Sequence, residues 1–172
     1  MDKGIFGGRI AAIRKGSKFE KETDIKNTFR KNGYIVSDSD EIFLGSASVG
    51  YVFDHAKIYK YIKTKENIDH EKINSKKYTP DQVFYNKKNN TYYVIEKKYQ
   101  EKAGSTDEKL QTCDFKKRRF TALLGANGAR VEYIYILNDF FKDKRYKDVF
   151  EYMEEKGVFY FFNEIPISFM IQ

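Results

Sequence analysis

The chain has 172 residues, of which 41% are hydrophobic and 33% are charged, and this is enough apolar material for the core of one domain. Its formal net charge of +7 favours a polyanionic partner such as nucleic acid, or reflects a lysine-rich solvated surface. The single cysteine, Cys113, excludes an internal disulfide and a cysteine-based zinc site, and it is typical of a reducing cytoplasm. The sequence has neither a long apolar run nor a Walker-type phosphate loop, so we expect no membrane segment and no nucleotide cofactor.

The N-terminal part of the chain predicts a loose arm and then a helix. Residues 1–16 contain three glycines before Arg9 and predict an arm attached to a single domain that spans the chain. Arg14 and Lys15 in this arm either contact phosphate or are simply solvated. Residues 17–34 predict a helix, because Ser17 suits an N-cap and acidic side chains follow it.

Helical and strand patterns alternate along the rest of the chain. They predict a short strand and a loop over 34–44, a helix over 50–65, a hairpin over 76–100, a helix over 104–125, a strand over 130–137, a helix over 139–157 and one or two closing strands over 158–171. Ser105 and Glu108 form a capping-box pattern at the start of the helix over 104–125.

This alternation predicts the fold class. Interleaved helices and strands indicate an α/β protein with a mixed central β-sheet flanked by helices. The strand–helix–strand pattern after the hairpin predicts two parallel strands joined by a crossover helix.

Acidic and basic side chains meet at the open end of the predicted hairpin. Asp81 opens the first arm, and the second arm ends in Glu96, Lys97 and Lys98. Because side chains alternate along a strand, Glu96, Lys98 and Gln100 share one face and Lys97 takes the other. Folding the hairpin brings Asp81 beside Glu96.

Two neighbouring carboxylates repel each other, and a divalent cation is the simplest way to hold both of them ionised. Oxygen ligands without a cysteine or histidine cluster favour Mg²⁺ over zinc. Such a metal binds a phosphate oxygen and lowers the pKa of a bound water. Together with Lys98, these are the groups needed for phosphodiester hydrolysis.

Asp81 followed by Glu96-x-Lys98 after a short hairpin resembles the PD-(D/E)XK nuclease motif. The predicted element order agrees with that superfamily across nearly the whole chain. Residues 14–36 are similar to the opening helix of archaeal Holliday junction resolvases, and residues 80–120 resemble the central block of small type II restriction endonucleases. The resemblance implies a restriction-endonuclease-like core.

The resemblance also implies roles for individual residues. Asp81 and Glu96 would bind Mg²⁺, for which Mn²⁺ is a possible substitute, and the backbone carbonyl of Lys97 could join them. Lys98 would assist the attacking water, and Gln100 resembles a polar residue often found two positions after this lysine.

An acid on the opening helix would complete the metal site. Spacing from Lys15-Gly16 favours Glu20, whereas spacing from Gly33-Tyr34 favours Glu22; both remain open, with Glu20 first. Either acid could instead simply favour a helix N-terminus.

A basic run follows the motif on its helix: Lys116, Lys117, Arg118 and Arg119. Because the four span all sides of a helical turn, we expect some to reach DNA phosphate and the others to be solvated.

The leading functional expectation is a Mg²⁺-dependent DNA endonuclease of the type II restriction kind, which cuts duplex DNA as a homodimer in the prokaryotic cytoplasm. A structure-selective nuclease of the junction-resolvase or repair kind is the alternative enzyme. A non-catalytic nucleic-acid-binding module is the alternative from another class, although the complete acid, acid and lysine set disfavours it.

Overall fold

The computed structural model describes residues 3–102 and 106–172, so the expected capping residue Ser105 lies outside the described part. Its helices are α1 (Lys3–Glu22), α2 (Ile25–Lys31), α3 (Lys57–Lys65), α4 (Thr106–Leu110), α5 (Cys113–Leu124), α6 (Lys147–Glu155) and α7 (Ile167–Met170). Its strands are β1 (Ile35–Val36), β2 (Glu41–Leu44), β3 (Ala47–Asp54), β4 (Gln82–Asn86), β5 (Thr91–Lys98), β6 (Arg130–Leu137) and β7 (Phe159–Phe162). Short 3₁₀ turns are η1 (His70–Lys72), η2 (Asp139–Lys142) and η3 (Lys144–Tyr146).

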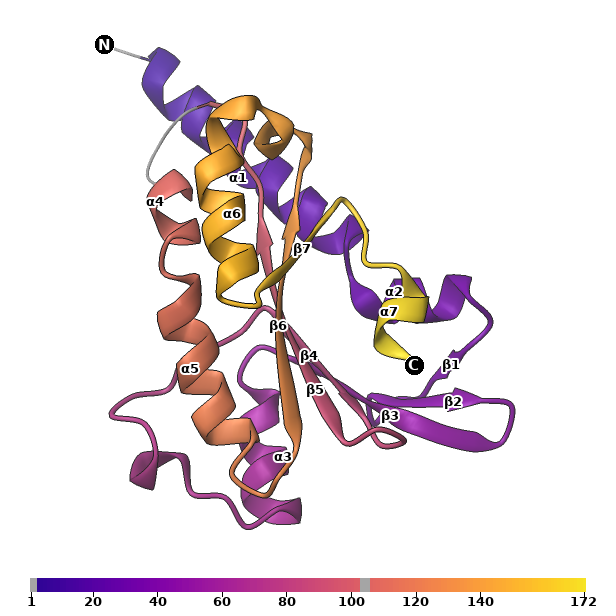
Figure 1. Ribbon diagram of the computed structural model, residues 1–172. Coiled ribbons are helices and arrows are strands. Elements are labelled where there is room, and N and C mark those ends of the chain that lie inside the picture. Colours follow the sequence, from indigo (N-terminus) through magenta and orange to yellow (C-terminus); the bar gives the residue numbers. More distant parts are fainter. Residues whose placement is uncertain (1–2, 103–105) are drawn as a thin grey trace.

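The strands form one mixed sheet of seven in the order β1-β2-β3-β4-β5-β6-β7 (Figure 1). Neighbouring strands are antiparallel from β1 to β5, and β5, β6 and β7 are parallel. The expected α/β class, the hairpin of β4 and β5 and the parallel pair of β5 and β6 are therefore confirmed. In the part of the chain that the structure describes, no helix is long and apolar enough to cross a membrane.

Helices cover both faces of the sheet. α3, α5 and α6 pack on one face, and α1, α2 and α7 supply side chains to the other (Figure 1). Successive residues of β5 alternate between these two cores: Val94 belongs to the first and Ile95 to the second. This alternation decides which helices the polar end of β5 meets.

The predicted first helix is instead two helices. α1 begins at Lys3, so residues 3–16, which we expected to form a loose arm, are helical, and α1 ends at Glu22. Asp24 then adopts extended backbone angles and accepts a hydrogen bond from the Lys26 amide, which makes it the N-cap of α2. Because of this break, Glu22 does not lie on one continuous helix with the apolar residues of α2.

The predicted helix over 50–65 is wrong in its first part, where residues 47–54 form β3 and only 57–65 form α3. Val52 and Phe53 are both buried, but on opposite faces of the sheet. A strand places consecutive side chains on opposite faces, whereas a helix does not. His55 has a positive φ of 48° and separates the two elements.

Three boundaries toward the C-terminus also differ from the prediction. The region 104–125 contains two helices, α4 and α5, and the region 139–157 begins with η2 and η3 before α6 starts at Lys147. The closing segment has one strand, β7, which agrees with the predicted one or two, but it ends in the short helix α7, which was not predicted. Pro166, at the N-cap of α7, has no amide hydrogen to continue a strand ladder.

Candidate active site

The hairpin of β4 and β5 brings two carboxylates together. Gln82 pairs with Ile95 in the antiparallel register, so Asp81, directly before β4, lies opposite Glu96. The Asp81 Oδ2 atom accepts a hydrogen bond of 2.6 Å from the Lys97 amide, which fixes its side chain against the end of β5. The Glu96 side chain is only 5% exposed.

Lys98 lies among the oxygens of this end of the sheet. Its Nζ donates to Glu96 Oε2 at 2.9 Å and to the Lys97 carbonyl at 3.0 Å. The same nitrogen is 3.9 Å from Asp81 Oδ2. One positive charge thus faces the three groups that the sequence suggested as metal ligands.

Lys97 points to the opposite face of the sheet, as the alternation predicts. Its Nζ donates to the Glu20 carbonyl of α1 at 3.0 Å. Burial lowers the pKa of Lys97, and the surrounding carboxylates, Asp24 and Asp81 first among them, oppose that shift only in part. This lysine therefore connects β5 to α1, whereas Lys98 faces the acid pair.

The two acids of α1 have different surroundings. Glu20 lines two cavities, of about 330 Å³ and about 210 Å³; Asp81 also lines the first and Lys98 the second, and Lys97 lines both. Glu22 is exposed and lies 3.6 Å from Lys18 in an ion pair along the helix. Both acids are exposed, but of the two only Glu20 shares a cavity with Asp81.

The basic run of α5 is divided among different contacts. The Lys116 Nζ is 3.3 Å from Glu96 Oε1, so it belongs to the site. The Lys117 Nζ donates to the carbonyls at the end of α6, at positions 156 and 157, both at 2.8 Å. Arg118 is exposed and paired with Asp114, and the Arg119 guanidinium lies over the Phe115 ring. The structure thus brings only Lys116 to the acid pair.

The remaining predicted residues lie at the edge of the site. Arg14 is exposed on α1, and Lys15 forms a 2.7 Å ion pair with Glu101. The backbone amide of Gln100 donates to Asn138 Oδ1 at 3.0 Å, and the side-chain Nε2 of Gln100 donates to the Lys102 carbonyl at 2.6 Å. These contacts of Gln100 fix the chain just after β5.

Several residues of the site were missed from the sequence. Tyr135 pairs with Glu96 in the parallel register, and its ring centroid is 5.9 Å from the Lys98 Nζ. Burial raises the pKa of Tyr133 and Tyr135, and Glu96 adds to the shift, so both hydroxyls stay protonated. Lys109 of α4 lines the smaller cavity. The apolar run of β6 predicted only a core strand, so nothing in the sequence indicated that its tyrosine hydroxyls lie near the acid pair.

A network of ion pairs lies at the start of α2, beside the larger cavity. The Lys26 Nζ is 2.7 Å from Asp40 Oδ1 and 2.5 Å from Asp54 Oδ2. Gln82 donates to both Asp24 and Asp54 at 2.9 Å. Burial opposes ionisation of Asp54, but hydrogen bonds from Lys26 and Gln82 outweigh it and lower its pKa. This network joins α2 to the sheet, and the ammonium group of Lys26 pairs with its carboxylates Asp40 and Asp54.

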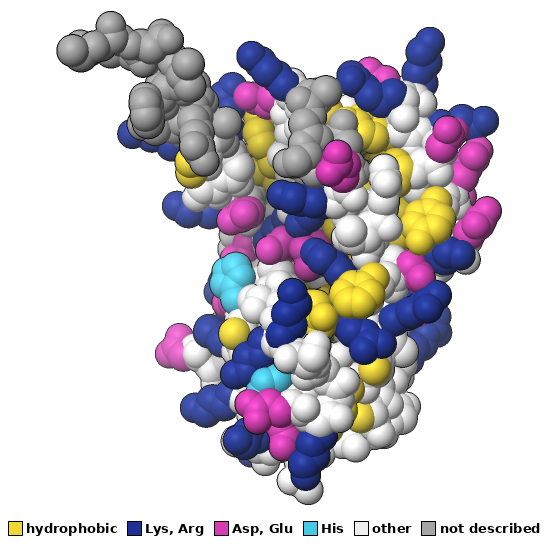
Figure 2. Space-filling model, turned by 90° about the vertical axis from the view of Figure 1, so that its left-hand side faces the viewer, with side chains coloured by type: hydrophobic (Ala, Val, Ile, Leu, Met, Phe, Trp, Pro, Cys, Tyr) yellow, Lys and Arg dark blue, Asp and Glu magenta, His cyan; other side chains and the backbone are white. Residues whose placement is uncertain are grey.

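Figure 2 views the molecule from the side of α4 and α5, and it shows acidic side chains gathered near a histidine and bordered by Lys and Arg. In the described residues, no group of three or more His, Cys, Asp or Glu side chains is arranged to hold a metal ion. The oxygens that converge on Lys98 nevertheless suit a cation, because two are carboxylate groups and the third is a backbone carbonyl.

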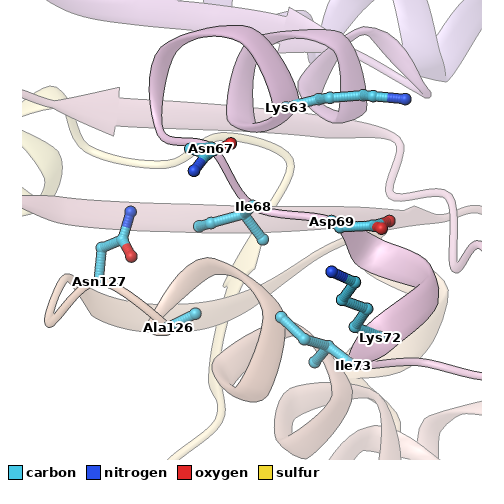
Figure 3. Close-up of a pocket in the computed structure, with 8 residues that line it drawn as sticks. All are labelled: Lys63, Asn67, Ile68, Asp69, Lys72, Ile73, Ala126 and Asn127. Carbon is cyan, nitrogen blue, oxygen red and sulfur yellow. The ribbon is translucent and has the colours of Figure 1, made fainter.

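A further cavity, of about 450 Å³, lies between the end of α3, η1 and the turn after α5 (Figure 3). Asp69 is the one carboxylate among its lining residues. This cavity therefore does not provide the paired acids of a metal-dependent hydrolase.

The chain matches the model of a known protein family. The family model of the PD-(D/E)XK nuclease superfamily domain matches residues 14–157, which is most of the chain, so the chain belongs to this superfamily. Neither a curated protein nor a solved structure matches the chain. The sheet with flanking helices is consistent with the restriction-endonuclease-like fold. Membership indicates a nuclease, whose substrate is nucleic acid, and nucleases of this superfamily generally use divalent metals.

Proposed function

We propose that the protein is a Mg²⁺-dependent DNA endonuclease that hydrolyses phosphodiester bonds. The observation that supports this most directly is the convergence of Asp81, Glu96 and the Lys97 carbonyl on the single ammonium group of Lys98. A structural ion pair needs one carboxylate, whereas this arrangement gathers a second acid and a carbonyl at the open end of the sheet.

Asp81, Glu96 and the Lys97 carbonyl would hold the metal, with Glu20 beside them and Mn²⁺ as a substitute. When bound, the metal supplies a water of lowered pKa and offsets negative charge on the phosphate. Lys98 has two roles in this scheme: its Nζ orients the attacking water by hydrogen bonding, and it stabilises charge on the pentavalent phosphorus. The water loses a proton to solvent as its oxygen forms the new bond to phosphorus; the bond between phosphorus and the leaving sugar oxygen breaks, and that oxygen takes up a proton from solvent.

Basic side chains around the site would bind the DNA backbone. Lys116 is placed best for this role, because its Nζ already lies 3.3 Å from Glu96. Arg14, Lys15 and Arg118 are more exposed and would contact phosphates farther along the strand. Phosphate contacts of this kind make binding depend strongly on salt concentration.

We further propose a type II restriction endonuclease, acting as a homodimer that cuts both strands of a two-fold duplex site. This rests on the likeness of residues 80–120 to the central block of small enzymes of that kind. The segment between α2 and Asp81, with its β2–β3 hairpin, could supply the element that reads the bases.

A structure-selective nuclease of the junction-resolvase or repair kind is the second candidate. A specific observation favours it: Phe115, directly before Lys116, is 52% exposed. An exposed aromatic ring beside a nuclease site suits a base that is not paired in a duplex.

The test is incubation with plasmid DNA, and separately with a four-way junction, in Mg²⁺ and in EDTA. Discrete plasmid fragments that need Mg²⁺ would support the restriction enzyme, and cleavage of the junction alone would support the structure-selective nuclease. The matched variants are Lys98→Ala, which we expect to be inactive, and Lys97→Ala, which we expect to cleave. Binding of DNA without any Mg²⁺-dependent cleavage would refute both enzymes and leave the binding module.

A further inference from the structure

An exposed aromatic ring with cations around it lies on α5, one residue before Lys116. Phe115 is on the flank of α5 that faces the segment before β4, and 52% of it is exposed. The Arg119 guanidinium carbon lies 5.8 Å from the Phe115 ring centroid, and the Tyr78 ring meets the same ring edge-on at 5.7 Å. Lys76 in turn lies 5.2 Å from the Tyr78 ring centroid.

The partners of Phe115 hold it in place. Tyr78 is fixed through its carbonyl, which accepts a 2.8 Å hydrogen bond from the Tyr59 hydroxyl. The same segment is joined to α5 by Asn74, whose side chain donates to the Arg119 carbonyl at 3.3 Å. A ring that is already fixed loses little conformational freedom when another flat group packs on it.

The turn of α5 that carries Phe115 also carries Lys116, which contacts the acid pair. Phe115 precedes Lys116, whose Nζ lies 3.3 Å from Glu96 Oε1, and Tyr78 lies three positions before Asp81. Figure 2 shows hydrophobic side chains between Lys and Arg side chains on the α5 side of the molecule. A strand that has its phosphate at the acid pair would thus have a neighbouring nucleotide within reach of Phe115.

We propose that Phe115, with Tyr78 and Arg119, is a stacking site for an unpaired DNA base next to the cleaved bond. The inference rests on the proposed nuclease function and names its substrate class: DNA with a single-stranded nucleotide, as in a flap or a branch. A base has an apolar π-face and a charged backbone, and this surface offers an aromatic ring together with Lys76, Lys116 and Arg119.

The charges around the ring disfavour a second copy of the chain as its occupant. A two-fold contact through Phe115 would bring the same cations face to face, on a chain whose formal net charge is already +7. The nearest acid of the helix, Asp114, is paired with Arg118 and so does not change the sign of this surface.

The test uses binding in EDTA, so that it needs no hydrolysis. The probe is a DNA duplex with a short single-stranded flap that contains 2-aminopurine, whose fluorescence falls when it stacks; a fully paired duplex is the comparison. We expect quenching with the wild-type protein. Phe115→Leu should abolish the quenching and weaken binding of the flap duplex by at least about fivefold, the lower end of the contribution of one stacked base.

Two variants complete the design. Phe115→Tyr keeps an aromatic ring and should keep the quenching. Phe159→Leu is the matched control, because Phe159 is the other exposed phenylalanine of the described residues and packs against α7 on the opposite face of the sheet; it should behave as wild type. Wild-type quenching and affinity in Phe115→Leu would overturn the proposal, as would loss of both in Phe159→Leu.

Cleavage of the same flap duplex in Mg²⁺ separates the two proposals. Quenching that depends on Phe115 without Mg²⁺-dependent cleavage of the flap duplex, the plasmid or the four-way junction would support the stacking site and refute the nuclease function. Cleavage without quenching that depends on Phe115 would support the nuclease and overturn the stacking site.

Discussion

Replacing Lys98 with methionine would test the central ion pairs of the proposed site. The substitution keeps most of the side-chain volume and removes the charge that lies 2.9 Å from Glu96 and 3.9 Å from Asp81. With an effective dielectric constant of about 20, the two attractions amount to about 6 and about 4 kcal/mol before the cost of desolvation. Breaking a buried ion pair typically costs about 3–5 kcal/mol.

The expected net loss is smaller than this range. Lys116 still faces Glu96 at 3.3 Å, and the Asp81 side chain is 28% exposed, so water screens part of the remaining repulsion. We therefore expect Lys98→Met to lower the free energy of unfolding by about 2–3 kcal/mol without metal. Mg²⁺ should recover much of this loss, because it replaces the missing positive charge. Cleavage should fall by at least about 100-fold, the lower range for loss of one charge-stabilising group.

The assay is urea unfolding followed by circular dichroism, with and without Mg²⁺, together with cleavage rates on the same protein samples. Lys97→Met is the control, because the charge of Lys97 is also buried but faces α1 and not the acid pair. Since burial lowers the pKa of Lys97, its charge destabilises the fold at pH values below that lowered pKa, and the penalty fades as the pH rises toward the ordinary lysine value. Near neutral pH, Lys97→Met should therefore be at least as stable as wild type and should keep far more activity than Lys98→Met. Equal losses of activity in the two variants would refute the assignment.

Three further predictions test other parts of the structure. Glu20→Gln should slow cleavage much more than Glu22→Gln, measured as single-turnover rates, because only Glu20 lines the cavities beside the acid pair. The lowered pKa of Asp54 gives stability that is present above the ordinary aspartate pKa and is lost as the pH falls through the lowered value. In urea unfolding at acid pH, Lys26→Met should therefore show less of this pH dependence than wild type. An unchanged pH profile would contradict the assignment of the shift to Lys26. Lys117→Met should reduce stability by about 1 kcal/mol, through its hydrogen bonds to the end of α6, while DNA affinity measured by fluorescence anisotropy stays close to that of wild type.

Local patterns in the sequence predicted the central elements well. The hairpin of β4 and β5 was recognisable because two β-rich arms flank a polar turn, and alternation along β5 correctly separated Lys97 from Lys98. Patterns of apolar spacing were ambiguous for β3. Val52 fits a helical stripe as well as a strand, and only its neighbours in the sheet select the strand.

The roles of single charged side chains were less predictable. Lys116 and Lys117 are adjacent in the sequence, yet one faces Glu96 and the other the end of α6. Helical periodicity gives the angle between two such side chains around the helix axis, but it does not predict which other elements of the fold each side chain contacts. The tyrosines of β6 show the same difficulty, because a buried strand and the lining of a site have the same apolar signature.

The sequence by itself determined the α/β class, the acid–acid–lysine spacing and the face of β5 on which each charge lies, because these follow from local backbone geometry. Tertiary structure alone decided that Glu20 and not Glu22 lines a cavity with Asp81, that Lys116 of α5 contacts Glu96, and that Phe115, next to Lys116 in the sequence, stays exposed. These contacts join residues far apart in the chain, and they depend on how helices pack on the two faces of the sheet. That packing results from the whole pattern of buried surface, which no short stretch of sequence contains.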